Sequence, residues 1–234
     1  MGVTQDGGKP VTAQHLLVRY AKRGKMRFAS HLDVARAFER GVRRAGLPIA
    51  YSAGFTPHPR ISYAGGAPTG VASEAEYLSL TLTSRTEAGT AGERLNAALP
   101  DGIDVITVTE DSGGLPASRL TASEWQVALP GLPADNVVPV VKKFLALTEA
   151  PVERLTSKGM RRMDARAAVV SLDVLDDART GLALRMVVRH TVPSVRPDDV
   201  LNALRDVADV FPAGQPLITR LTQGSLGESG VVKL

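Results

Sequence analysis

Two histidines lie in a basic stretch of the chain, and imidazole is the side chain best suited to acid–base chemistry near neutral pH. His31 follows Ser30 at the expected start of a helix, where the helix dipole favours the neutral, base-competent ring. His58 lies between Pro57 and Pro59, which hold their loop extended and stiff. We interpret His58 and His31 as candidate catalytic residues, acting as acid and base on a phosphodiester if the fold brings them together.

Each histidine also has a plainer interpretation. Ser30 and Asp33 have the spacing of a helix-capping pair, and His58 could be a turn histidine hydrogen-bonded to the backbone. A metal held by both histidines with Asp33 or Glu76 is disfavoured, because two histidines this far apart in sequence are a weak metal signal. We therefore expect no metal site and no cofactor.

A ridge of arginines is the second feature with chemical meaning. Arg36, Arg40 and Arg43 follow at steps of four and three, so a helix aligns them on one side, where they can follow a phosphate backbone. The alternative is an ordinary solvated helix face. The candidate nucleic-acid-binding residues are Lys22, Arg23, Lys25, Arg27, Arg36, Arg40, Arg43, Arg44 and Arg60, with Lys158, Arg161 and Arg162 in a second basic loop.

The helix that carries this ridge is predicted over residues 31–45. Ser30 is its expected N-cap, and Gly46 with Pro48 ends it. Its apolar side chains recur at three and four, the spacing of a helix with one buried face. The residues expected on that face are Leu32, Ala35, Phe38, Val42 and Ala45.

Composition excludes several classes of protein. The 234 residues contain no cysteine, which rules out disulfides, thiolate zinc sites, cysteine nucleophiles and iron–sulfur clusters held by this chain. The chain has no apolar run of about 18 residues and no apolar signal core at its N-terminus. We therefore expect a soluble cytoplasmic protein without a membrane partner.

Charge is distributed unevenly along the chain. Residues 1–60 hold eleven Lys and Arg against three Asp and Glu, whereas the remainder carries a small excess of acidic residues. A basic first quarter on a mildly acidic body indicates one surface that meets a polyanion, and nucleic acid is the usual one.

The order of expected elements is β-α-β-β-α-β, once in each half. It predicts an α+β protein of two tandem ferredoxin-like (βαββαβ) halves with antiparallel sheets. In the first half, 48–51 is expected to be a short strand, and Glu74 with Glu76 is interpreted as charge on an edge strand. His190 is expected to pack or to pair with backbone. The expected segments are a disordered N-terminus over 1–12, a ferredoxin-like domain with the basic helix over 13–111, a linker over 112–122, a second ferredoxin-like domain over 123–226 and a C-terminal tail over 227–234.

Two groups of residues carry a resemblance to a known family. The chain resembles a bacterial family of radical-SAM-associated domains of unknown function, found alone or fused C-terminally to cobalamin-binding-type radical SAM proteins. The likeness covers roughly residues 14–225. The matching positions are Arg27, Phe28, Ser30, His31, Leu32, Asp33, Gly54, Phe55, Pro57, His58, Pro59, Ser62, Gly70, Glu74 and Glu76, followed by Ser157, Lys158, Gly159, Asp164 and Arg166.

The resemblance implies an accessory role beside radical SAM chemistry, in the modification of RNA such as tRNA. The chain lacks the cysteines of the iron–sulfur cluster and so is not itself the radical SAM enzyme. A looser likeness, by element order alone, is to tandem ferredoxin-like RNA-processing proteins that cleave CRISPR repeats, in which a histidine near the first helix can serve as base.

These observations favour a non-catalytic RNA-binding accessory protein that acts with a radical SAM enzyme in RNA modification. The first alternative is an RNA-processing enzyme, a metal-independent nuclease or transferase that uses His58 and His31. The second is a purely protein-interacting module, in which the arginine ridge meets an acidic surface. Whether the chain is an enzyme stays open at this point.

Overall fold

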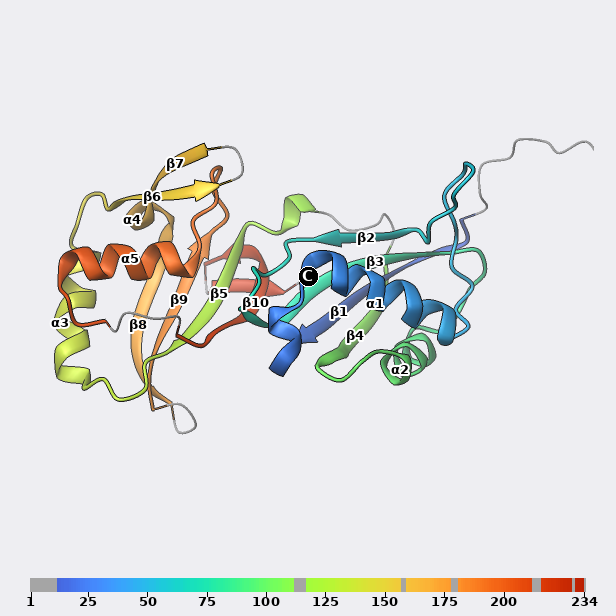
Figure 1. The fold of residues 1–234 in the computed structure, drawn as a ribbon, viewed down its shortest axis with the longest axis horizontal. Coiled ribbons are helices and arrows are strands. Elements are labelled where there is room, and N and C mark those ends of the chain that lie inside the picture. Colours follow the sequence, from blue (N-terminus) through green and yellow to red (C-terminus); the bar gives the residue numbers. More distant parts are fainter. Residues whose placement is uncertain are drawn as a thin grey trace, which may run out of the picture. The chain divides into compact units, whose positions relative to one another are not determined.

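The computed structural model describes residues 12–111, 117–156, 159–177, 181–211, 216–228 and 230–233 (Figure 1). Contacts divide the chain into two compact units. Unit 1 comprises Met1–Gly70 and Ala75–Ala117, and unit 2 comprises Val71–Glu74 and Ser118–Leu234. Each unit is a ferredoxin-like α+β domain with an antiparallel sheet, as the element order predicts.

Unit 1 follows the predicted βαββαβ order. Its elements are β1 (Gln14–Lys22), the 3-10 helix η1 (Gly24–Phe28), α1 (His31–Arg44), β2 (Ile61–Ala64), β3 (Ala72–Leu82), α2 (Ala88–Ala98) and β4 (Ile103–Asp111). The strands are ordered β4-β1-β3, with β2 on the other side of β3. β1 pairs antiparallel with β4, and β2 pairs antiparallel with β3.

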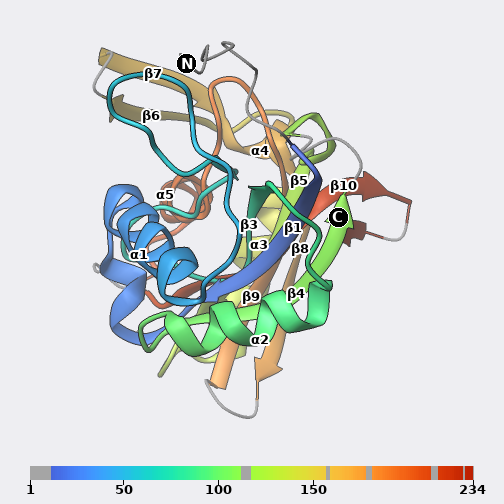
Figure 2. The same cartoon turned by 90° about the vertical axis from the view of Figure 1, so that its right-hand side faces the viewer.

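Strand alternation builds the core of unit 1. Along β1 the side chains of Leu16, Val18 and Tyr20 are buried at every second position, the pattern of a strand with one face on a core. They pack with the buried faces of α1 and α2, which lie against the same sheet (Figure 2). Phe38 of α1 meets Tyr20 edge to face, with ring centroids 4.7 Å apart.

Helix α1 begins as predicted. The Ser30 hydroxyl accepts the N–H of Asp33 at 3.2 Å, and the Asp33 carboxylate accepts the N–H of Ser30 at 3.1 Å, which completes a capping box. At the other end Gly46 takes the left-handed φ of +59° after the last turn.

The buried face of α1 differs in part from the prediction. It consists of Val34, Ala37, Phe38, Gly41 and Val42, and Ala45 follows it into the core. Phe38, Val42 and Ala45 are therefore confirmed. The prediction is wrong for Leu32, which is 57% exposed, and Ala35 is only half-buried. Leu32 precedes Phe38 by two successive steps of three, which together turn it about 120° around the helix axis, away from the face that packs on the sheet.

Two expectations for the middle of unit 1 are wrong. Residues 48–51 form no strand, only isolated bridges from Ile49 to Leu82 and from Tyr51 to Pro59. Strand β3 is interior to its sheet, and Glu76 on it is 3% exposed, so this glutamate is not edge-strand charge.

Unit 2 has the same core arrangement with additions. Its elements are η2 (Ala117–Arg119), β5 (Ala122–Ala128), α3 (Ala134–Leu145), β6 (Pro151–Thr156), β7 (Gly159–Asp164), α4 (Ala165–Ala168), β8 (Val169–Asp177), β9 (Gly181–Arg189), α5 (Pro197–Val207), β10 (Ile218–Gly227) and β11 (Gly230–Lys233). The strands are ordered β10-β5-β9-β8, all antiparallel neighbours. This is the ferredoxin-like order of unit 1, β4-β1-β3-β2.

The additions to unit 2 were not predicted. The hairpin of β6 and β7, with the short α4, is inserted between α3 and β8 (Figure 1). The tail expected over 227–234 contains β11, which pairs antiparallel with β10. In the expected linker over 112–122, residues from 117 onward form η2 and the start of β5, and 112–116 lie outside the described residues.

Most of the N-terminal segment expected to be disordered, residues 1–11, also lies outside the described part of the chain. In the part that is described, none of the helices has the length and the apolar run needed to cross a bilayer.

Candidate nucleic-acid interface

The arginine ridge lies on the exposed side of α1. Arg36, Arg40 and Arg43 are all exposed, and none makes an ion pair within the described residues. Arg44 beside them is exposed too, and its Nη1 donates to the carbonyl of Ala98 at 3.3 Å. The ridge therefore presents three exposed guanidinium groups without an ion pair in the described residues. After the hydrogen bonds from Ser30, the charge of Arg36 also helps to lower the pKa of the nearby Asp33 carboxylate.

The turn before α1 adds further positive charge. Lys25 on η1 is exposed. Arg23 is about half exposed and pairs with Asp104 at 2.9 Å, so part of its charge is compensated. The guanidinium of Arg27 stacks over the ring of Phe28, 4.6 Å from its centroid, and 58% of Phe28 is exposed.

Lys22 is a correction to the predicted set. It is 4% exposed, and its ammonium donates to the carbonyls of Ala67 at 3.3 Å and Pro68 at 3.5 Å. A buried ammonium with backbone acceptors cannot meet a phosphate backbone from solution. Lys22 instead holds the segment 65–70, the glycine-rich connection between β2 and β3.

Two more bonds fix the 65–70 segment. The carboxylate of Glu76 accepts the N–H of Ala67 at 3.1 Å, and the carbonyl of Arg27 accepts the N–H of Gly70 at 2.8 Å. A side chain at Gly66 would reach 3.8 Å from His31 Nδ1 and 3.9 Å from Glu76 Oε2. His31 and the buried Glu76 therefore border the same point of this segment.

His31 is exposed at the first position of α1. Its ring meets Tyr63 of β2 edge to face, with centroids 5.2 Å apart and an interplanar angle of 83°. The Tyr63 hydroxyl is buried and has no hydrogen-bond partner among the described residues. Burial, and then the charge of Glu39, raises the pKa of Tyr63 above its usual range.

His58 lies in a separate loop of unit 1. Its N–H donates to Ser52 Oγ at 3.0 Å and its carbonyl accepts the N–H of Ser52 at 2.9 Å, whereas its exposed imidazole has no partner in the described chain. The bonds expected for a turn histidine therefore involve the backbone of His58 and not its ring. The next residue but one, Arg60, is exposed and its Nη1 lies 3.4 Å from Thr12 Oγ1.

The structure does not bring the two candidate catalytic histidines together. His31 contacts Tyr63, near the end of β2, whereas His58 precedes the start of β2 at Ile61. Figure 1 shows α1 beginning at one end of unit 1 and the loop over 51–59 projecting from the end at which α1 finishes. A shared acid–base pair on one phosphodiester has no support in this geometry, and a catalytic role for either histidine alone stays a prediction.

The second basic loop belongs to unit 2. Arg161 and Arg162 are exposed on β7, with no ion pair in the described residues, and Lys158 lies outside those residues. The hairpin is anchored at Arg154 of β6, which forms an ion pair with Asp199 of α5 and donates to the carbonyl of Ser194 at 2.8 Å. The inserted hairpin therefore presents two further arginines from a fixed base.

His190 pairs with backbone, as predicted. Its Nδ1 lies 2.7 Å from the carbonyl of Leu120, and its Nε2 lies 2.7 Å from the hydroxyl of Ser123. Nδ1 therefore carries the proton and donates, and Nε2 accepts from the serine. His190 as a residue is exposed, but both of its ring nitrogens are bonded to the protein, and partial burial of the ring is the main cause that lowers its pKa. Ser123 is fully buried, so this pair is structural.

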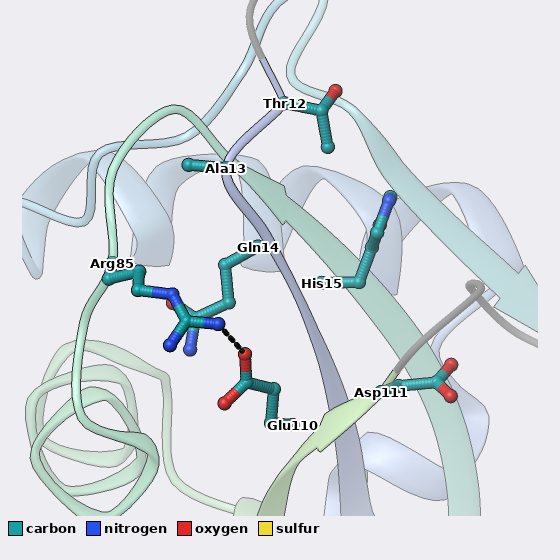
Figure 3. A pocket seen from close by; sticks show the side chains of 7 residues that line it. All are labelled: Thr12, Ala13, Gln14, His15, Arg85, Glu110 and Asp111. Atoms are coloured by element: carbon teal, nitrogen blue, oxygen red, sulfur yellow. Dashed lines mark hydrogen bonds and ion pairs between the residues drawn. The ribbon is translucent and has the colours of Figure 1, made fainter.

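A polar cavity of about 530 Å³ in unit 1 was missed by the sequence analysis (Figure 3). His15 and Asp111 line it from directly opposed positions on β1 and β4, and Asp111 Oδ2 is buried without a partner in the described structure. Arg85 and Glu110 close one side with an ion pair of 2.9 Å. Only the register of the two strands brings these residues together, so sequence spacing carries no signal for them.

No described group of three or more His, Cys, Asp or Glu side chains is arranged to hold a metal ion. The described groups of unit 1 that could meet an anion are the exposed guanidinium groups, Lys25 and the imidazoles of His31 and His58.

A comparison with protein families decides the family. The profile of a family described as uncharacterized proteins conserved in bacteria (DUF2344) matches residues 15–197. The chain belongs to this family. The description confirms a bacterial family without an established function, and it names no activity, cofactor or radical SAM partner.

Comparison with solved structures shows the fold. A chain in the crystal structure of a Cbf5-Nop10-Gar1 complex is similar with a TM-score of 0.51 and 11% sequence identity. The similarity covers 94% of this chain and 52% of that one, so this chain spans about half the length of its structural neighbour. A search of curated proteins finds no match.

Proposed function

We propose that this protein binds RNA through unit 1 and acts as a non-catalytic accessory to a radical SAM enzyme in RNA modification. The observation that carries the proposal is the ridge of Arg36, Arg40 and Arg43, exposed and without ion pairs in the described residues. A row of exposed guanidinium groups on one helix face, with no ion pair in the described residues, suits an anion from outside.

RNA fits the ridge better than a small anion. The three arginines span two turns of α1, a length of about 10 Å, which suits successive phosphates of a strand rather than one phosphate group. The neighbouring Arg27 and Phe28 form a partly exposed stack of guanidinium and aromatic ring. RNA-binding proteins use such planes to stack unpaired bases.

The accessory role rests on two supports. His31 and His58, the candidate acid and base, lie at different places in unit 1, so no paired catalytic centre supports an RNA-cleaving reaction. The partner is inferred from the resemblance to radical-SAM-associated domains. Co-purification of a radical SAM protein with this chain from its own cells would test the partner separately from RNA binding.

The test of RNA binding is retention of RNA by the purified protein across a salt series from about 50 mM to about 200 mM, where counterion release strongly changes affinity. Wild type is compared with the triple variant Arg36→Glu/Arg40→Glu/Arg43→Glu. We expect wild type to bind with a steep salt dependence, and the triple variant to lose binding because each substitution replaces attraction with repulsion.

A matched control makes the same charge change elsewhere. Arg119, Lys142 and Lys143 are exposed residues of unit 2, and reversing all three should leave retention close to wild type. Loss of retention in both triple variants would show that net charge, and not the ridge, governs binding. No retention by wild type even at low salt would end the RNA proposal.

The bound RNA is also checked for cleavage. Intact RNA agrees with the accessory role. Shortened RNA that requires His58 or His31, tested by His58→Ala and His31→Ala, would establish the nuclease alternative instead. If the ridge variant breaks a protein complex and RNA retention is unchanged, the ridge binds an acidic protein surface.

A further inference from the structure

A loop in unit 1 presents an aromatic ring to solvent. This Phe55 loop, residues 51–59, follows α1 and precedes β2. Phe55 at its tip is fully exposed, and Tyr51 at its base is 37% exposed. Figure 1 shows the loop projecting from the end of unit 1 at which α1 ends. The ring of Phe55 adds nothing to the core of its own domain, and at the tip of a loop it is open to contact from outside the chain.

The loop is closed at its base and stiff. Tyr51 and Pro59 form an antiparallel bridge, the N–H of Ser52 donates to the carbonyl of His58 at 2.9 Å, and the N–H of Arg60 donates to that of Ala50 at 2.8 Å. Pro57 and Pro59 add fixed φ angles. A restrained loop loses less conformational freedom when it meets a ligand.

The backbone at the tip turns through glycine. Gly54 has a φ of +122°, a value that side-chain-bearing residues rarely adopt. A side chain at Gly54 would meet nothing within 4 Å, so the glycine is required by the turn and not by space. Phe55 directly follows this turn, so the conformation of Gly54 sets the direction of the backbone from which the exposed Phe55 ring projects.

The chain segment that contains the loop carries no acidic side chain. Residues 45–73 contain no Asp and no Glu, and the basic groups of the loop and its exit are His58 and Arg60, both exposed. At the end of α1, Arg43 and Arg44 are exposed a few residues before the loop begins. An aromatic ring on a segment that carries basic and no acidic side chains suits a polyanion with planar groups.

We propose that Phe55 stacks on an unpaired base of the RNA whose backbone follows the arginine ridge, so that unit 1 selects single-stranded over double-stranded RNA. This inference rests on the proposed RNA binding and specifies its substrate class. Bases of a duplex are already stacked on one another, whereas an unpaired base offers its face to an aromatic side chain. The imidazole of His58 and the ring of Tyr51 offer further planes on the same loop.

The experiment measures the affinity for a single-stranded RNA of about 12 nucleotides, within the site sizes of single-strand binders, and for a duplex of equal length. The proteins are wild type, Phe55→Ala, Phe55→Trp and, as the matched control, Val192→Ala, which truncates another fully exposed apolar side chain. We expect Phe55→Ala to weaken single-strand binding by roughly 5-fold to 150-fold, the usual effect of removing one base-stacking ring. Duplex binding, the salt slope and the melting temperature should stay as in wild type.

Phe55→Trp supplies a direct signal. The one native tryptophan, Trp125, is 7% exposed and is shielded from a bound RNA. The fluorescence that Phe55→Trp adds therefore reports contact at the Phe55 loop. We expect single-stranded RNA to quench that added signal and affinity to be retained. Unchanged single-strand affinity in Phe55→Ala, while the ridge variant still loses binding, would refute the stacking role and leave RNA binding standing.

Two other results would also overturn the inference. An equal loss of single-strand and duplex affinity in Phe55→Ala would show a general contact without selection of unpaired bases. Binding of wild type to anionic lipid vesicles that Phe55→Ala abolishes, with RNA affinity unchanged, would assign the ring to a membrane surface. If wild type binds neither RNA, the proposed function itself fails together with this inference.

Discussion

The rings of His31 and Tyr63 meet edge to face, with centroids 5.2 Å apart. Tyr63 also faces Phe38, with centroids 6.3 Å apart. The first residue of α1 is thereby joined to β2, and through Phe38 to the core of unit 1. The arginine ridge therefore stands on a helix whose beginning is fixed against the sheet, which suits a rigid surface for a strand of RNA.

Tyr63→Phe should not destabilise the protein. The hydroxyl is buried without a partner in the described residues, so its removal relieves an unsatisfied polar group and keeps the ring contacts. Because burial raises the folded pKa of Tyr63 above the unfolded value near 10, the tyrosine contributes stability below about pH 10 that is lost as pH rises further. Thermal melting should show Tyr63→Phe retaining more stability than wild type at alkaline pH. Truncation by Tyr63→Ala should instead cost about 2–4 kcal/mol, and a loss of similar size in Tyr63→Phe would contradict the prediction.

Ser30→Ala should weaken the start of α1. The substitution removes the acceptor for the N–H of Asp33, and loss of a serine N-cap costs about 1 kcal/mol. The hydrogen bond from the Ser30 side chain, with that from its backbone, lowers the pKa of Asp33. That contribution is present above the unfolded pKa near 4 and lost as pH falls through the folded pKa. Urea unfolding at neutral and at acidic pH should therefore show a larger difference from wild type at neutral pH. Ser62→Ala, an exposed serine on β2, serves as the control.

Lys22→Met and Lys25→Met should separate a structural lysine from a binding one. Lys22→Met leaves two carbonyls of the 65–70 segment without their donor and should cost about 1–3 kcal/mol of stability, with little change in the salt slope of RNA binding. Lys25→Met should leave stability unchanged and lower that slope by about 0.7–1, the share of one phosphate contact. Thermal melting measures the stability of each variant, and binding at several salt concentrations measures its salt slope. If Lys22→Met lowered the salt slope and left stability unchanged, Lys22 would belong to the RNA interface after all.

His190 should make unit 2 sensitive to mild acid. Burial lowers its folded pKa below the unfolded value near 6.5, so the unfolded state takes up the proton first, and stability falls as pH drops below about 6.5. Protonation also removes the acceptor that Nε2 provides to Ser123. Melting temperatures between about pH 5 and about pH 7.5 should show less acid sensitivity in His190→Phe than in wild type. The matched variant His58→Phe, at an exposed imidazole without a partner, should keep the sensitivity of wild type; an equal change in both variants would rule out His190 as the source.

Local sequence patterns predicted the order of the elements, the start of α1 and its exposed basic side. The βαββαβ order of both halves, the capping box at Ser30 and the exposed arginines of α1 follow from alternation and helical spacing, which act over a few residues. The pairing of His190 with backbone was also predicted. Leu32 shows where such reasoning goes wrong, because the steps of three from Leu32 to Ala35 and from Ala35 to Phe38 each look helical, yet together they place Leu32 off the buried face.

Tertiary structure decided what depends on neighbours distant in sequence. Lys22 and Glu76 look like surface charges in sequence, and burial against the 65–70 segment gives both a structural role. His31 and His58 lie in one basic stretch, yet the path of α1 and β2 keeps them apart. The sequence by itself therefore determined which elements form and where positive charge concentrates, because propensity, capping and composition are local. Only the fold decided which charged groups and which aromatic rings are exposed to solvent, because burial depends on how separate segments pack.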